Sequence, residues 1–417
     1  MSKYHLAWIT VVAAIPTLVG CGADAPTFSS NKIYTAKVER DTEKLAPTAA
    51  QDVANVVGAL FGTPDVPHML TGGELAVEEV LDVDNLAIAA GPITMENFGQ
   101  GKGLYRQHCV HCHGITGDGR GPTASFLNPY PRDFRPGKFK FKSTPIGSKP
   151  TRDDLERIIR QGIEGTAMPA FHTALKAGEI EAVGDYVRYL AIRGETERKL
   201  LDFQATESSY EEGNAEANKA AIAELEDFEL LSSIVGEVVD SWRTAEEEAT
   251  EVEGRSEVYD RASSEFDADE LAASIERGKK HYFGGGICHT CHGETQLGDG
   301  NRTDYDFWTK EYFDWVTFKG TDDYAKAYAK YKKLEGLSLQ NIIPRNLRRG
   351  VYRGGRRPLD IYWRIKNGIE GGPMPAANAT LFQDDDIWDI VNYVLSLPYE
   401  DLSRPNDDAE GYHRDRN

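Results

Sequence analysis

The stretch that decides the fold is Cys109-Val110-His111-Cys112-His113, and its pattern returns at Cys288-His289-Thr290-Cys291-His292. Two cysteines separated by two residues and followed directly by a histidine are typical of a c-type haem attachment site. The two thiols can add to the two vinyl groups of one porphyrin, and the histidine can reach the iron as its proximal ligand. The sequence therefore predicts two covalently attached c-type haems, held by Cys109, Cys112 and His113 and by Cys288, Cys291 and His292.

Zinc binding and thioredoxin-like redox chemistry are the alternatives for paired cysteines. Zinc sites usually combine two Cys or His pairs that lie near one another, whereas these cysteine pairs lie 179 residues apart. A thioredoxin-like motif does not explain why a histidine follows the second cysteine in both copies. Haem attachment accounts for both observations.

The fifth cysteine, Cys21, lies in an N-terminal segment that is typical of an export signal. Lys3 precedes an apolar run at 6–15, and small residues follow just before Cys21. The run is shorter than the roughly 20 residues that a membrane-spanning helix needs. This pattern favours a bacterial lipoprotein signal, with lipidated Cys21 as the mature N-terminus, over a plain signal peptide or an uncleaved anchor. We expect an exported, periplasmic-side lipoprotein anchored to the membrane.

Composition and charge are those of a globular, acidic protein. The 417 residues are 40% hydrophobic and carry a net charge of −20. Residues 202–270 hold 22 acidic against 4 basic side chains, so most of the excess lies in one segment. Apolar residues at spacings of three and four within it predict an amphipathic helix: Leu225, Phe228, Leu231, Ile234, Val235 and Val238. The more polar part at 246–270 is either a solvated helix or a loose linker, and the acidic surface is either a spacer or a docking face for a basic partner.

An internal repeat surrounds the two motifs. Residues 101–105 match 278–282, residues 131–135 match 344–348, and residues 162–170 match 368–376. Each half closes with a helical pattern of apolar residues: Ile180, Val183, Tyr186, Val187 and Leu190, then Ile387, Ile390, Val391, Val394 and Leu395. The second copy is about 34 residues longer before Pro344, and this insert is rich in aromatic residues and lysine. Its acidic, exported context argues against nucleic acid as a partner, and a haem-covering or partner-facing element is the preferred interpretation.

Met168 and Met374 are the predicted distal iron ligands. They occupy equivalent positions in the repeat, 55 and 82 residues after their histidines, in loops of Gly and Pro. A thioether ligand favours Fe(II), so His/Met ligation raises the reduction potential. Core packing is the alternative role for each methionine.

Histidine is the competing distal ligand, and it would lower the potential. The first half offers His68, His108 and His172, whereas His413 is the only histidine after His292. His111 and His289 lie between the paired cysteines, where exposed spacers are more usual than ligands. Bis-histidine ligation is therefore hard to arrange in the second half.

Other repeated residues suggest how a haem is held and how the halves pack. Arg132 and Arg345 occupy equivalent positions, where a planar guanidinium either binds a haem propionate or forms a surface salt bridge. Four tyrosines and two glycines are expected where the first and last helices of each half cross: Tyr105, Tyr186, Tyr282, Tyr393, Gly101 and Gly278.

The motifs together resemble the class I cytochrome c family, twice over. The resemblance covers about residues 98–192 and 275–397, with Gly-x-x-x-Tyr, C-x-x-C-H-Gly and Gly-x-Met-Pro or its near variant in the family's order. It implies small all-α domains, each wrapping one covalently held haem with an exposed edge. Within the family the chain is similar to diheme, membrane-associated subunits of respiratory complexes, such as alternative complex III or a haem–copper oxidase. The acidic linker and the aromatic insert depart from a plain tandem cytochrome.

The predicted organisation is all-α, with two cytochrome c-type domains joined by a long acidic, mostly helical linker. A lipoprotein-type signal peptide occupies 1–21 and a tether or wrap 22–97. The first domain spans 98–195, the linker 196–274, the second domain 275–400 and a polar tail 401–417.

Two functions fit this organisation. The preferred one is a carrier, or an electron-transfer subunit of a larger oxidoreductase complex, that moves electrons between respiratory-chain partners without substrate chemistry. The alternative is a diheme peroxidase-like enzyme with one open iron. A methionine at the same place in both halves weighs against the enzyme.

Overall fold

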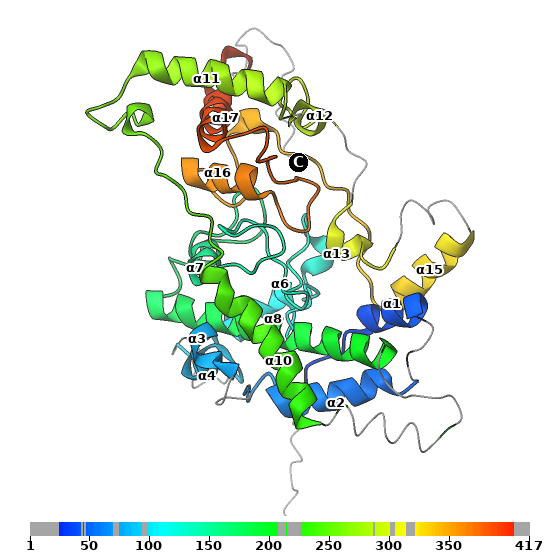
Figure 1. Ribbon diagram of the computed structural model, residues 1–417. Coiled ribbons are helices and arrows are strands. Elements are labelled where there is room, and N and C mark those ends of the chain that lie inside the picture. Colours follow the sequence, from blue (N-terminus) through cyan, green and yellow to red (C-terminus); the bar gives the residue numbers. More distant parts are fainter. Residues whose placement is uncertain are drawn as a thin grey trace, which may run out of the picture.

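The computed structural model describes residues 25–42, 45, 47–69, 75–93, 99, 101–206, 214, 225, 227–286, 288–300, 305–313 and 322–403. This part of the chain is helical, and its β-structure is limited to two isolated bridges, Gly62 with Pro67 and Tyr305 with Asn341. The expected all-α class is therefore confirmed. Two helical bodies lie one above the other (Figure 1). No helix in the described ranges is long and apolar enough to cross a membrane.

The lower body contains the first motif and is built around one long helix. α5 (Leu104–His108) leads into the motif, and α6 (Val110–His113) carries most of it. α7 (Arg152–Gln161) and α8 (Ala177–Thr206) follow. Thr151 is the N-cap of α7, and its hydroxyl accepts a hydrogen bond from the Asp154 amide at 3.1 Å. α8 continues without a break through the expected domain boundary at 195/196.

α8 is buried along most of its length because the segments before and after it pack around it. From the N-terminal region come α1 (Lys32–Thr42), α2 (Ala49–Phe61) and α4 (Val83–Ala89), and the short α3 (Val77–Val80) lies beside α10. α10 (Phe228–Arg243) packs on α8 from the acidic segment. These helices and α8 share one continuous core.

The expected amphipathic helix in the acidic segment is α10, and it packs on the first domain rather than spanning between domains. Leu231, Val235 and Val238 are buried there, and Trp242 joins them. Phe228 was expected on the same face but is 69% exposed, because it is the first residue of the helix, directly after the N-cap Asp227. The acidic side chains therefore stay on the outer side of a packed helix.

The stretch between α10 and the second body is extended, but it is anchored at several points. The Thr250 amide donates to Ser143 O at 3.0 Å, and its hydroxyl bonds Asn367 Oδ1 at 2.9 Å. Farther on, Arg255 donates to Asn392 Oδ1. The loose-linker interpretation of 246–270 is wrong for this stretch, since it contacts both bodies.

The upper body contains the second motif. α11 (Ala268–Phe283) leads into α12 (Cys288–His292), and α16 (Pro358–Asn367) and α17 (Asp384–Ser396) close the domain. α11 crosses α17 at Gly278, where a Cβ atom would lie 2.0 Å from Asp389 O. The expected close approach is therefore present here. The counterpart Gly101 precedes α5 instead, and a Cβ there would face the Glu179 carboxylate, so that part of the expectation is wrong.

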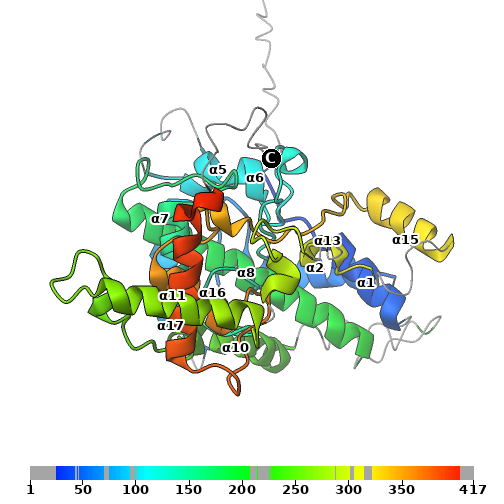
Figure 2. The same ribbon diagram turned by 90° about the horizontal axis from the view of Figure 1, so that it is seen from above.

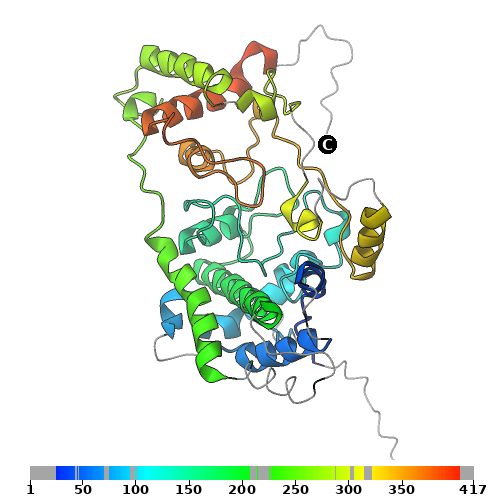
Figure 3. The same ribbon diagram turned by 45° about the vertical axis from the view of Figure 1, so that its right-hand side comes forward.

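The aromatic insert contributes α13 (Phe307–Lys310) and α15 (Asp322–Lys333). Tyr312, Phe313 and Tyr331 form a small core with Ala36 of α1. α15 lies beside α1 in all three views (Figures 1, 2 and 3). α15 and the aromatic residues around it thus pack on the N-terminal region, whereas Trp315, Phe318 and the side chain of Trp308 lie outside the described residues.

Polar contacts between buried side chains join the two bodies. Lys142 Nζ lies 2.8 Å from Glu370 Oε2, with side chains only 4% and 7% exposed. Asn367 Nδ2 donates to Ser143 O at 2.8 Å, and Arg157 lies 3.4 Å from Asp360 Oδ1. Figure 3 shows α16 and its neighbouring loops facing the first domain across this interface.

Candidate haem-binding sites

The two predicted proximal histidines are held in the same way. His113 Nδ1 lies 3.0 Å from Arg132 O, and His292 Nδ1 lies 3.2 Å from Arg345 O. A carbonyl can only accept a hydrogen bond, so each Nδ1 carries the proton and each Nε2 keeps its lone pair for a metal. Burial lowers the pKa of His113 to about 4 and also lowers the pKa of His292, which keeps both rings neutral.

A buried tyrosine fixes the chain just after each motif. Tyr105 Oη donates to Gly114 O at 2.8 Å, and Tyr282 Oη donates to Gly293 O at the same distance. The Tyr105 ring lies 4.9 Å from that of Tyr186, and the Tyr282 ring 5.5 Å from that of Tyr393. The four tyrosines thus pack between helices as expected, and two of them also tie the motif to the helix crossing.

No disulfide joins the four motif cysteines to one another or to another described residue. Burial raises the pKa of Cys109 to about 12 and that of Cys288 to about 11. The described residues include no group of three or more His, Cys, Asp or Glu side chains placed to hold a metal ion.

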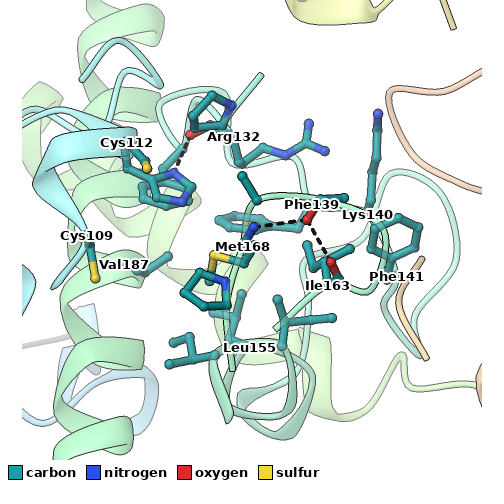
Figure 4. A pocket seen from close by; sticks show the side chains of 18 of the residues that line it. Cys109, Cys112, Arg132, Phe139, Lys140, Phe141, Leu155, Ile163, Met168 and Val187 are labelled. Atoms are coloured by element: carbon teal, nitrogen blue, oxygen red, sulfur yellow. Dashed lines mark hydrogen bonds between the residues drawn. The ribbon is translucent and has the colours of Figure 1, made fainter. Parts of the chain in front are cut away.

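A cavity of about 280 Å³ brings the predicted residues of the first site together. Its lining includes Cys109, Cys112, His113 and Met168, and most of the remaining wall is apolar. Figure 4 shows the two cysteines on one side, Met168 facing them, and Arg132 at the end away from the cysteines. Residues that are 59 positions apart in the sequence therefore face one space.

The two methionine loops share one backbone geometry. The Ile163 amide donates to Met168 O at 3.1 Å, and the Ile369 amide donates to Met374 O at 2.9 Å. Each loop begins at a glycine of positive φ, Gly162 at +68° and Gly368 at +72°. A Cβ at Gly162 would lie 2.5 Å from the Pro169 carbonyl carbon, so the chain returns across the glycine and only glycine fits.

The alternative histidine ligands of the first site are placed differently. His68 and His172 are exposed and hydrogen-bond to the carbonyls of Ala59 and Arg160, away from the cavity lining. His108 and His111 line the cavity on the side of the cysteines. Met168 is thus the residue on the facing wall that can supply a distal ligand, and His413 lies outside the described residues.

The backbone carbonyls of Arg132 and Arg345 accept hydrogen bonds from His113 and His292. The two arginine side chains, however, lie in different surroundings. The Arg132 side chain lines the first cavity. Arg345 reaches toward the first domain, where a Cβ on Gly165 would lie 3.1 Å from its Nη2. Its Nε has no hydrogen-bond partner in the described part of the chain.

Four further residues belong to the first site although the repeat pattern does not single them out as functional. Phe134 stacks on the His113 ring at 4.7 Å, and its place in the repeated segment 131–135 was the available signal. Lys140, Asp306 and Arg353 line the cavity beside Arg132. The last two come from the second domain, and no local pattern connects them with the first motif.

These residues fit a haem at the first site. Two thiols and a neutral imidazole lie on one side of an apolar cavity, with a thioether opposite. Bound there, a haem iron supplies reversible one-electron chemistry. The chain orients the imidazole and excludes water. The second domain repeats the local hydrogen bonds of the histidine, the tyrosine and the methionine loop.

Comparison with known proteins identifies the same two regions. Residues 96–187 match the family described as cytochrome c oxidase, cbb3-type, subunit III, and residues 275–398 match the family described as cytochrome c. The chain therefore contains two cytochrome c-type domains in tandem, and such domains imply haem c binding and electron transfer.

Among solved structures, the chain is similar to a chain of the reducing HAO-like protein complex of Kuenenia stuttgartiensis. The identity is 25% and the TM-score 0.39, with 73% of this chain and 97% of that chain covered. No curated protein sequence matches the chain.

Proposed function

We propose that this protein is a diheme electron carrier with one covalently attached haem at Cys109 and Cys112 and another at Cys288 and Cys291. The observation that carries the proposal is that the proximal histidine and the methionine loop have the same hydrogen bonds in both domains. Two equivalent six-coordinate haems with His and Met ligands suit electron transfer without substrate chemistry. An enzyme with an open iron would need the two sites to differ.

Met168 and Met374 are the distal ligands in this proposal, and both haems have high potentials because a thioether favours Fe(II). Electrons enter at one haem, pass to the other and leave to a redox partner. The partners are other redox proteins or a respiratory complex, and the protein is either a free carrier or a subunit of such a complex.

The protein is further proposed to act at the outer face of a bacterial membrane, held by a lipid on Cys21. The apolar run and small residues before Cys21 support this address. Cell fractionation of a Cys21→Ser variant tests it: the variant should leave the membrane fraction, and unchanged membrane association would remove the lipid anchor from the proposal.

Carbon monoxide titration of the reduced full-length protein tests the electron-carrier function. Two closed irons should leave the spectrum unchanged, and the oxidised protein should show the weak Met–iron absorption band at an intensity that corresponds to two haems. Haem staining after denaturation first establishes that both groups are covalently attached. Full-occupancy carbon monoxide binding at one haem would instead favour the peroxidase-like enzyme.

A further inference from the structure

The first haem cavity has one wall that both domains build. Arg132 and Lys140 come from the first domain, and Asp306 and Arg353 come from the second. Lys140 Nζ lies 3.4 Å from Asp306 Oδ2 across the domain boundary. The first cytochrome domain is therefore incomplete at this wall without its partner domain.

Arg353 is placed at the cavity by a turn that is seated on the first domain. The turn lies between η5 (Leu347–Arg349) and α16. Arg157 Nη1 donates to Gly354 O at 3.4 Å, and Arg364 donates to Arg353 O. Gly354 has φ +84°, and a Cβ there would lie 2.4 Å from the Phe141 ring, so the turn packs directly against the cavity wall.

Cations outnumber acidic residues among the described residues that line this wall. Arg132, Lys140 and Arg353 supply three cations. Two acidic residues line the cavity, Asp306 and Asp154, and Asp154 is paired with Arg157 at 3.0 Å. Burial lowers the pKa of Lys140 to about 8 and that of Arg353 to about 10. Buried like charges are costly unless an anion joins them. Arg353 Nε has no hydrogen-bond partner in the described ranges.

A haem attached at Cys109 and Cys112 supplies the matching anion. Its two propionates leave the porphyrin at the edge opposite the two vinyl groups. Arg132 and Lys140 lie at the end of the cavity away from the cysteines (Figure 4), and Arg353 lines the same cavity. Two propionates carry two negative charges and would place carboxylates beside these cations. A guanidinium binds a carboxylate with two parallel hydrogen bonds.

We propose that the second domain completes the first haem site, with Arg353 binding a propionate of the first haem together with Arg132 and Lys140. This inference rests on the proposed haem attachment at the first motif. Through this contact, Arg353 makes the reduction potential of the first haem depend on the docking of the second domain.

The test measures both reduction potentials of the full-length protein in Arg353→Gln by spectroelectrochemistry. A nearby cation disfavours the more positive, oxidised iron, so its removal should lower the potential of the first haem. A Met168→His variant identifies which of the two waves belongs to that haem. Arg353→Lys, which keeps the charge but loses the planar fork, should restore part of the shift.

Arg356→Gln is the matched control, because it removes the same charge three residues away. Arg356 donates to Tyr399 Oη at 2.9 Å within the second domain, so its loss should leave the first wave in place. Equal potentials in Arg353→Gln and the parent protein, or an equal shift in Arg356→Gln, would overturn the proposal. If haem staining finds no attached haem, the proposed function fails instead, which separates the two results.

Discussion

At the scale of single residues, the backbone does as much as the side chains to define each haem site. The carbonyls of Arg132 and Arg345 accept hydrogen bonds from His113 and His292, which selects the tautomer able to bind a metal through Nε2. Such a bond orients the ring and raises its basicity. Because any residue has a backbone carbonyl, this hydrogen bond depends on where the Pro-Arg pair lies in the chain and does not need the arginine side chain.

Replacing Met374 with His should lower one of the two potentials and abolish one Met–iron band. Imidazole favours Fe(II) less than a thioether does, and axial ligands set haem potentials over a range of roughly 0.8 V. Potentiometric titration checks this. Met69→Leu is the control, since Met69 is a buried core residue of the N-terminal region and its replacement should move neither potential. Two unchanged potentials in Met374→His would remove Met374 as a ligand.

At the scale of elements, the helix crossing of the second domain is tied to its haem motif. α11 and α17 approach at Gly278, and Tyr282 on α11 packs on Tyr393 and donates to Gly293 O after the motif. A shift of α11 relative to α17 is therefore transmitted to the motif through the buried side chain of Tyr282. In the first domain Tyr105 plays the same role, although α5 is much shorter than α11.

Gly278→Ala should destabilise the second domain by about 1–3 kcal/mol, because the new Cβ overlaps the Asp389 carbonyl and backbone must move. Thermal unfolding followed at the haem absorbance measures it. Gly58→Ala is the control: Gly58 is interior to α2 with nothing within 4 Å of a Cβ, so alanine should be neutral or stabilising by up to about 1 kcal/mol. Equal melting temperatures for the two variants would contradict the conclusion that α11 and α17 are in tight contact at Gly278.

At the scale of the whole molecule, buried charges join the two domains next to their haem sites. Glu370 lies in the loop that carries Met374, and it pairs with Lys142 and accepts from the Gly147 amide at 3.2 Å. Burial lowers the pKa of Lys142, against the opposing effect of Glu370. The second methionine loop is thus held partly by the first domain.

Lys142→Met should cost about 3–5 kcal/mol of stability, because it leaves the Glu370 carboxylate buried without its cation. Urea denaturation measures this loss of stability, and the two domains of the variant should unfold in separate transitions. Lys326→Met is the control. Lys326 and Asp323 are 80% and 76% exposed, so breaking that pair should cost less than about 1 kcal/mol. A Lys142→Met protein as stable as the control would show that the interface does not depend on this pair.

The sequence predicted the helical class and the repeat because both follow from local patterns. The two motifs, the paired methionine loops and the helical spacing before Leu190 and Leu395 each lie within a short stretch. Prediction from the sequence failed where the placement of a residue depended on where its helix begins. Phe228 fits the apolar stripe but starts its helix, and Gly101 matches Gly278 in sequence but lies outside any helix.

By itself, the sequence determined that this protein carries two cytochrome c-type units and which residues are candidates to hold their haems. Only the tertiary structure decided that the extended segment after α10 is anchored to both domains and that Asp306 and Arg353 line the first cavity. The physical reason is that ligand spacing along a chain is a local property, whereas charge balance in a buried cavity depends on side chains brought together by folding. Arg353 is 240 residues from His113 in the chain, and only the packing of one domain on the other makes them neighbours of one site.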